Sequence, residues 1–157
     1  MAEVSSQTTG TADREIVIAR RFDAPRELVW QAWTEPEDLI QWWGPNGFTN
    51  TFHEIDVRPG GVWRFVMHGP DGTDYDNFSR FIEVVRLERI VFDHGASEND
   101  VMFRSSVTFE QSGGGTDLTL RMVFPTREQR DAAIEKYGAI EGGNETLGRL
   151  GEHLKTM

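Results

Sequence analysis

Cysteine is absent from this chain of 157 residues. Its absence excludes disulfide frameworks, thiolate nucleophiles and cysteine-based zinc or iron–sulfur sites. Metal-binding patterns are missing too, because the four histidines are scattered and form no HExxH motif: His53, His68, His94 and His153. No glycine cluster carries the lysine of a phosphate-binding loop or opens a helix after a strand. We therefore expect neither a metal ion nor a cofactor.

Basic residues are scarce as well. Sixteen Lys and Arg stand against 26 Asp and Glu, which gives a formal net charge of −10. A field of that sign repels phosphate backbones and anionic lipid, so nucleic acid is not an expected partner. No stretch is long and apolar enough to span a membrane, so membrane insertion is not expected either.

The beginning of the chain has none of the features of a signal peptide. Residues 1–12 are mostly small and polar, with no basic segment and no apolar run. We interpret them as a disordered tail and place the protein in the cytoplasm. The remaining length suits one hydrophobic core, so residues 13–157 are predicted to form a single domain.

Aromatic residues are plentiful, with ten Phe and five Trp against only two Tyr. After a β-rich stretch over residues 14–22, Pro25 suits the first turn of a short helix. Apolar side chains then recur at helical spacing up to Trp33. A second short helix is predicted to run to about Trp43, with Thr34 and Glu37 as a capping box at its start.

Beyond this point the apolar pattern alternates with a period of two, which predicts strands over residues 48–57, 62–68, 73–85, 89–95, 101–111 and 116–124. The short turn-rich loops between them are typical of antiparallel neighbours. A helix over residues 126–137, a break near Gly138 and a final helix over about residues 140–155 complete the pattern. The predicted class is α+β, with a seven-stranded antiparallel sheet that buries one face against the last helix.

An ordered series of motifs resembles one known family. The motifs are Ala24-Pro25 with Val29-Trp30-Gln31-Ala32-Trp33, Trp42-Trp43-Gly44-Pro45-Asn46-Gly47-Phe48, Asp56-Val57-Arg58-Pro59-Gly60-Gly61, Pro70-Asp71-Gly72, Glu88-Arg89-Ile90-Val91-Phe92 and Thr146-Leu147 with Leu150. They resemble the homologues of the heat-shock-protein ATPase activator (AHSA-type), in the START-related SRPBCC superfamily that includes the birch-pollen allergen and polyketide cyclases. The resemblance implies the helix-grip fold, in which a curved sheet wraps round a long C-terminal helix. Many relatives carry an aromatic residue where this chain has Gly143, so we expect a larger or more open cavity there.

The resemblance leaves three functions open. The leading one is binding of a small apolar, aromatic or lipid-like ligand between sheet and helix, as a carrier, sensor or regulator. The second is a cavity enzyme of the polyketide cyclase or hydrolase type, although the sequence offers no GxSxG elbow. The third is regulation of a chaperone ATPase; this partner is doubtful, because the extra N-terminal domain of the eukaryotic activators is missing. Homodimerisation also stays open.

The alternation of side chains along the strands predicts which residues face the interior and could bind a ligand. His94 shares a strand face with Ile90 and Phe92, where a desolvated imidazole could bind a polar ligand group or act as a base. Tyr75 would face the same interior as Ser79 and Phe81 if its strand stays regular. The adjacent Trp42 and Trp43 should divide between core and cavity mouth, and the arginines at 64, 80, 104 and 121 should face outward toward carboxylates. The predicted ligand-binding residues are Trp33, Trp43, Trp63, Phe65, Met67, Tyr75, Phe81, Phe92, His94, Met122, Tyr137, Gly143 and Leu147.

Overall fold

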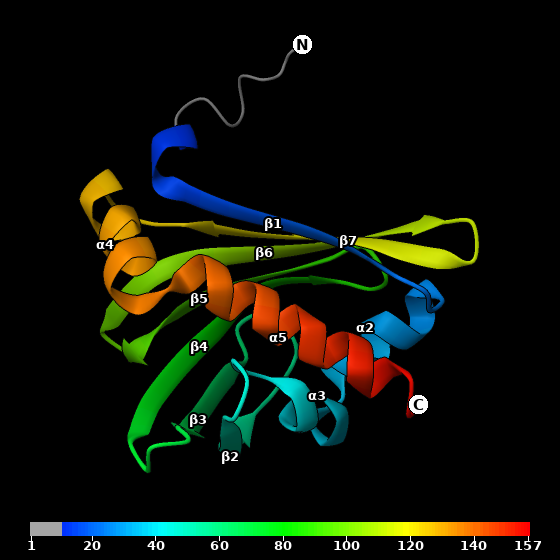
Figure 1. Ribbon diagram of the computed structural model, residues 1–157, viewed down its shortest axis with the longest axis horizontal. Helices are drawn as coiled ribbons and strands as arrows, with labels where there is room; N and C mark the ends of the chain where they lie inside the picture. The colour runs from blue at the N-terminus through cyan, green and yellow to red at the C-terminus, as the bar shows by residue number, and fades with distance from the viewer. Residues whose placement is uncertain (1–10) are drawn as a thin grey trace.

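The computed structural model describes residues 11–157 (Figure 1). A strand, two short helices, six strands and two helices follow one another as predicted. The elements are η1 (Ala12–Arg14), β1 (Glu15–Phe22), α2 (Arg26–Thr34), α3 (Pro36–Trp42), β2 (Thr49–Ile55), β3 (Val62–His68), β4 (Asp74–Val85), β5 (Arg89–Ser97), β6 (Asp100–Ser112), β7 (Gly115–Val123), α4 (Arg127–Tyr137) and α5 (Ala139–Leu154).

The strands form one antiparallel sheet in the order β1-β7-β6-β5-β4-β3-β2. Strands β2 to β7 are a meander, and β1 returns to pair with β7 through the register Ile16 to Met122. Figure 1 shows the sheet curving around α5, which crosses its concave face. The α+β class and the helix-grip architecture predicted from the sequence are confirmed.

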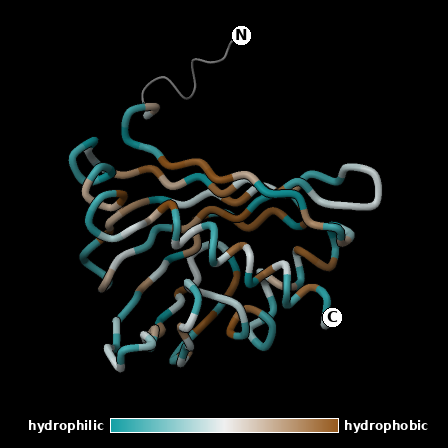
Figure 2. Tube along the Cα trace, viewed as in Figure 1, coloured by the Kyte–Doolittle hydropathy of each residue, from teal (hydrophilic) through white to brown (hydrophobic). Residues whose placement is uncertain are grey.

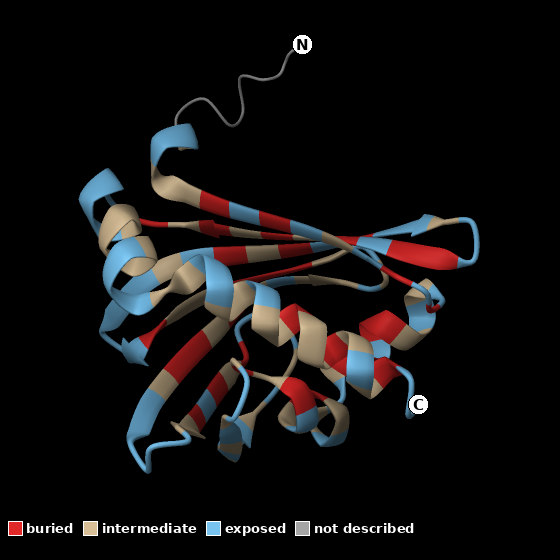
Figure 3. Ribbon diagram, viewed as in Figure 1, coloured by how far each residue is buried: buried red, intermediate tan, exposed pale blue. Residues whose placement is uncertain are grey.

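Burial follows the alternation expected of a sheet with one covered face. Along β7 the buried residues include Leu118, Leu120 and Met122, at every second position. Figure 2 shows the apolar residues concentrated along the strands, and Figure 3 shows buried bands alternating with accessible ones. The concave face is therefore the side that the helices cover.

The link between α2 and α3 differs from the predicted capping box. Thr34 is the last residue of α2, and its hydroxyl donates to the carbonyl oxygen of Trp30 at 2.9 Å. Glu35 is the residue that caps α3, and its side chain makes no capping hydrogen bond. The prediction was wrong because the threonine hydroxyl turns back by one helical turn instead of forward to the next helix.

The C-terminal helices meet at Gly138, where the break was predicted. Its φ of +62° is a left-handed conformation that favours glycine, and it ends α4 and starts α5. Leu147 and Leu150 on α5 are fully buried. A Cβ atom at Gly143 would lie 2.5 Å from Cδ1 of Ile18, so this glycine lets α5 lie close to β1.

Two further predictions concern the start of the chain and membranes. Residues 1–10 of the predicted tail lie outside the described residues, whereas Ala12 belongs to the short turn η1. Within residues 11–157, no helix has the length and apolarity needed to cross a membrane.

Candidate ligand-binding cavity

One end of the concave face is filled by aromatic side chains from α3, β3 and β4. Trp42 is fully buried, and its Nε1–H donates to the carbonyl oxygen of Ala32 at 3.0 Å. Trp63 and Phe65 stack with ring centroids 4.2 Å apart, and Phe81 lies parallel to Trp63 at 6.3 Å. We call this set of residues, 42, 63, 65 and 81, the filled end.

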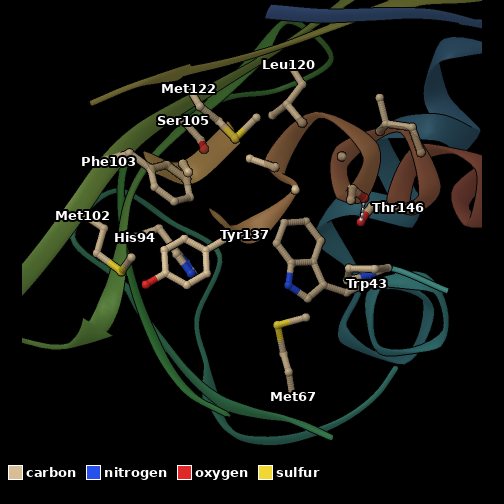
Figure 4. A pocket seen from close by; sticks show the side chains of 18 of the residues that line it. Trp43, Met67, His94, Met102, Phe103, Ser105, Leu120, Met122, Tyr137 and Thr146 are labelled. Atoms are coloured by element: carbon tan, nitrogen blue, oxygen red, sulfur yellow. Dashed lines mark hydrogen bonds between the residues drawn. The ribbon is translucent and has the colours of Figure 1, made fainter. Parts of the chain in front are cut away.

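The other end contains a cavity of about 300 Å³ (Figure 4). Such a volume is at the lower limit of small-molecule sites, which run from about 300 to 1,000 Å³. The walls come from α2, β3, β5, β6, β7, the 43–45 loop, α4 and the first half of α5. They are formed by Trp33, Trp43, Gly44, Pro45, Met67, Phe92, His94, Met102, Phe103, Ser105, Leu120, Met122, Phe124, Ala133, Tyr137, Gly138, Ala139, Gly142, Gly143, Thr146 and Leu147.

Most of the residues nominated from the sequence lie in these walls, namely Trp33, Trp43, Met67, Phe92, His94, Met122, Tyr137, Gly143 and Leu147. Trp63, Phe65 and Phe81 belong instead to the filled end, where all three are buried. Tyr75 lies near the outer end of β4, is 48% exposed and has its ring 6.0 Å from that of Phe48. The division of the tryptophan pair is as predicted, with Trp42 in the core and Trp43 at the cavity.

Several wall residues were missed by the sequence reasoning. Phe103 and Ser105 lie on β6, directly opposite His94 and Phe92. Their alternation on β6 was the available signal, because Val107 and Phe109 continue the same buried face. The small residues of the helices, such as Ala139 and Gly142, carried no comparable pattern.

The 43–45 loop is held in place by hydrogen bonds to its backbone. Arg149 on α5 donates from Nη1 to the carbonyl oxygens of Gly44 and Pro45, both at 2.9 Å. Asn50 donates from Nδ2 to the carbonyl oxygen of Trp43 at 2.9 Å. Gly44 has a φ of +98°, which favours glycine, and a Cβ there would lie 2.7 Å from Cε of Met67. These contacts fix the wall that presents the Trp43 indole to the cavity.

His94 is the central polar residue of the cavity. Its Nδ1 lies 2.8 Å from Oγ of Ser79, which is fully buried. The strand register produces this pair, because a bulge between Phe81 and Glu83 shifts the β4–β5 pairing by one residue and brings Ser79 opposite His94. The adjacent Gly95 can only be glycine, since a Cβ would overlap the carbonyl oxygen of Asp100.

Burial sets the charge of this imidazole. The ring of Phe103 is 5.2 Å from the ring of His94, and that of Phe65 is 6.1 Å away. Desolvation in these surroundings lowers the pKa of His94 from 6.5 to about 4. His94 is therefore neutral near pH 7, where it can donate one hydrogen bond and accept another.

Charged side chains lie on the other face of the sheet. Arg104 binds both carboxylate oxygens of Asp93, at 2.7 and 3.0 Å, and Arg121 reaches Glu15 at 3.1 Å. The predicted outward orientation of the strand arginines is confirmed. The cavity lining includes no Asp, Glu, Lys or Arg. Across the described part of the chain, no cluster of three or more potential ligand residues could hold a metal ion.

The sequence and the fold are similar to those of known proteins. Residues 23–155 match the family model described as Activator of Hsp90 ATPase homolog 1-like protein. A crystal structure of a Nitrosomonas europaea protein is similar, with 28% identity, a TM-score of 0.84 and coverage of 92% of this chain and 96% of that one. A Mycobacterium smegmatis protein has 27% identity, a TM-score of 0.84 and coverage of 93% and 94%. A search of curated proteins found no match.

Proposed function

The chain belongs to the family of Activator of Hsp90 ATPase homolog 1-like proteins, and we propose that it binds a small apolar or aromatic, lipid-like ligand in the cavity beside α5. The family and the helix-grip fold support a role in ligand binding or regulation in general. We further propose that binding takes place in this cavity through apolar contacts, and that the protein is located in the cytoplasm, as predicted from the sequence.

The observation that carries the proposal is an apolar cavity with only a few polar groups in its walls. Phe92, Met122 and Leu147 supply large apolar surfaces, and His94 supplies a polar point. This combination is typical of small-molecule sites, where apolar area gives affinity and a few polar atoms fix orientation. The proposal therefore assigns the walls to affinity and His94 to orientation.

An entrance lined with apolar side chains also supports the proposal. Met102 is 44% exposed and Tyr137 is 79% exposed, although both contribute to the cavity walls. Figure 4 shows the two side chains on the same side of the cavity as His94. A ligand entering past them would exchange water for apolar contacts from the outset.

The expected affinity follows from the area that a ligand can bury. About 250 Å² of apolar ligand surface at about 25 cal/mol per Å² corresponds to roughly 6 kcal/mol, or a Kd of a few tens of micromolar. The entropic cost of association weakens this value. Assays should therefore cover the range from about ten micromolar to one millimolar.

The test is a thermal-shift screen with fatty acids, two-ring aromatic ketones and polyketide-like phenols. A ligand present at ten times its Kd stabilises the fold by about 1.4 kcal/mol, which should raise the Tm by roughly 3–6 °C. The variant Gly143→Trp should lose this shift, because it adds an indole to the cavity wall beside Ile18. Gly151→Ala is the control, since position 151 lies on the same helix but outside the cavity. No shift with any compound would overturn the proposal.

A cavity enzyme is the second candidate, and the Ser79–His94 hydrogen bond is the observation that favours it. Two features weaken a hydrolase mechanism. Ser79 is fully buried beneath the imidazole, so its hydroxyl does not reach the cavity as a nucleophile. Burial also lowers the pKa of His94 to about 4, which makes it a poor general base at neutral pH. Ester turnover that disappears in His94→Gln would support the enzyme over the binding protein.

Regulation of a chaperone ATPase is the activity that the family description names. For this chain it is a separate proposal, and it needs its own measurement. Stimulation of a purified Hsp90 ATPase by the wild-type chain and by Gly143→Trp would support a regulator that acts independently of the cavity.

A further inference from the structure

We propose that the cavity selects uncharged ligands that carry a hydrogen-bond acceptor oxygen, such as a ketone or ester carbonyl, and that Nε2–H of His94 holds this oxygen. The inference rests on the proposed function and narrows it to one class of ligand. It is carried by the hydrogen-bonding requirements of Ser79 and by the absence of charge from the cavity lining.

The hydroxyl proton of Ser79 determines which nitrogen of His94 carries hydrogen. Ser79 is fully buried, and within residues 11–157 its side chain has a single hydrogen-bond partner, Nδ1 of His94 at 2.8 Å. If Nδ1 were protonated, it would donate to Ser79 and leave the buried hydroxyl proton without an acceptor. Ser79 therefore donates to Nδ1, and the hydrogen of the neutral imidazole is on Nε2.

The Nε2–H group then faces the cavity as a donor without an acceptor. No hydrogen bond to this atom occurs in the part of the chain that the structure describes, and it is not among the fully enclosed polar atoms that lack partners. The Nε2 atom is therefore partly accessible. Because His94 lines the cavity, this accessible surface faces the cavity (Figure 4). A donor in apolar surroundings favours a ligand that brings an acceptor.

Ser105 extends this donor site along the wall. Ser105 is only 2% exposed, and no hydrogen bond of its hydroxyl occurs within residues 11–157. Its oxygen is not among the fully enclosed polar atoms that lack partners, so it keeps some accessible surface. Ser105 lies opposite Phe92 on one side and Met122 on the other. We call His94 and Ser105 the polar strip. A ligand oxygen placed here can receive hydrogen bonds while the carbon skeleton contacts the apolar walls.

The surroundings of the strip exclude a charged ligand. A carboxylate in the cavity would have no Lys or Arg in the lining to pair with. The nearby Arg149 is occupied by the carbonyl oxygens of residues 43–45, and Arg104 is paired with Asp93 on the outer face. Burial opposes protonation of His94, so the imidazole does not supply the missing cation. A cationic ligand would equally lack a carboxylate partner.

Three probes with one carbon skeleton test the inference by titration calorimetry at pH 7.5. They are 2-acetylnaphthalene, 2-isopropylnaphthalene and 2-naphthoate, which differ in the presence of an acceptor oxygen and in charge. We expect the ketone to bind about tenfold more tightly than the hydrocarbon, and the carboxylate to bind most weakly. In His94→Phe the preference for the ketone should shrink, and with Ser105→Ala added the ketone and the hydrocarbon should bind equally, whereas His94→Gln, which keeps a donor, should retain part of the preference.

The outcomes separate this inference from the proposed function. Binding of none of the probes would overturn both. Equal binding of ketone and hydrocarbon by the wild-type chain, or tightest binding of the carboxylate, would overturn the inference and leave the proposed function standing. A measurement without variants is the long-range ¹H–¹⁵N spectrum of the imidazole rings. It should show the Nε2–H tautomer for His94, and an Nδ1–H tautomer would contradict the inference.

Discussion

The two ends of the sheet's concave face carry similar residues but are packed differently. At the filled end, Trp42, Trp63 and Phe65 are each at most 1% exposed, the rings of Trp63 and Phe65 stack, and the ring of Trp42 packs edge-on against that of Trp43. At the cavity end, Phe92 and Phe103 also face inward, yet about 300 Å³ remains unoccupied beside them. An aromatic sheet face is therefore compatible with either a solid core or a cavity.

The difference lies in the helices that face the sheet. At the filled end, helix α3 places the large, fully buried ring of Trp42 in the core. The first half of α5 instead presents Ala139 and Gly142, which are too short to fill the space between helix and sheet. The cavity is thus created by small residues on α5, and the strands opposite them supply its walls.

The largest expected effect is on stability at the filled end. Trp42→Ala should lower the free energy of unfolding by about 3–5 kcal/mol, because it opens a void and leaves the carbonyl oxygen of Ala32 without its donor. Met122→Ala, which borders existing empty space, should cost no more than about 2 kcal/mol. Urea unfolding of both variants measures these values. Equal losses would show that the two ends are packed alike.

The next effect is a pH dependence that comes from the cavity end. His94 has a pKa of about 4 in the folded chain and an ordinary value of 6.5 when unfolded, so protons bind preferentially to the unfolded chain. The free energy of unfolding should therefore fall as the pH drops below 6.5, and by about 3 kcal/mol at pH 4.

The variant His94→Phe isolates this contribution. It keeps the other three histidines and all the carboxylates, so subtraction of its pH profile leaves the share of His94. Parallel profiles for the wild-type chain and the variant between pH 7 and pH 4 would mean that the cavity end is wet and His94 well solvated.

A smaller effect is expected when a larger side chain at position 142 partly fills the cavity. At Gly142 a Cβ would make ordinary contact with Cγ of Pro45 at 3.6 Å, so the helix can accept a side chain there. Gly142→Leu should raise the free energy of unfolding by about 0.8 kcal/mol through helix propensity, and it should weaken binding of 2-acetylnaphthalene at least about tenfold. Gly151→Ala should give the gain in stability alone. Unchanged affinity in Gly142→Leu would place the ligand elsewhere.

Much of the fold could be predicted because local sequence features mark where most strands and helices begin and end. The alternating apolar pattern and the short turns specify the antiparallel strands, and Gly138 marks the junction between α4 and α5. Strand parity also placed His94 and Asp93 on opposite faces, as the structure has them. These properties depend on neighbours along the chain, which is why one sequence is enough to predict them.

The division of the concave face could not be predicted in this way. Phe81 and Phe92 share the inward face, and only the positions of the helices decide which of them borders empty space. The Ser79–His94 pair depends on a one-residue bulge in β4, and no sequence motif predicts this bulge. Tyr75 has inward parity, but β4 extends beyond the part of the sheet that α5 covers.

The most direct test of a binding cavity uses the methionine methyl groups. Met67, Met102 and Met122 line the cavity, while Met157 lies at the C-terminus away from it. With ¹³C-methyl methionine and saturating 2-acetylnaphthalene, we predict intermolecular NOEs from the probe to Met67 and Met122. The Met157 methyl should show none. NOEs confined to Met157, or none to Met67 and Met122 at saturation, would contradict the account of the cavity end as a ligand site.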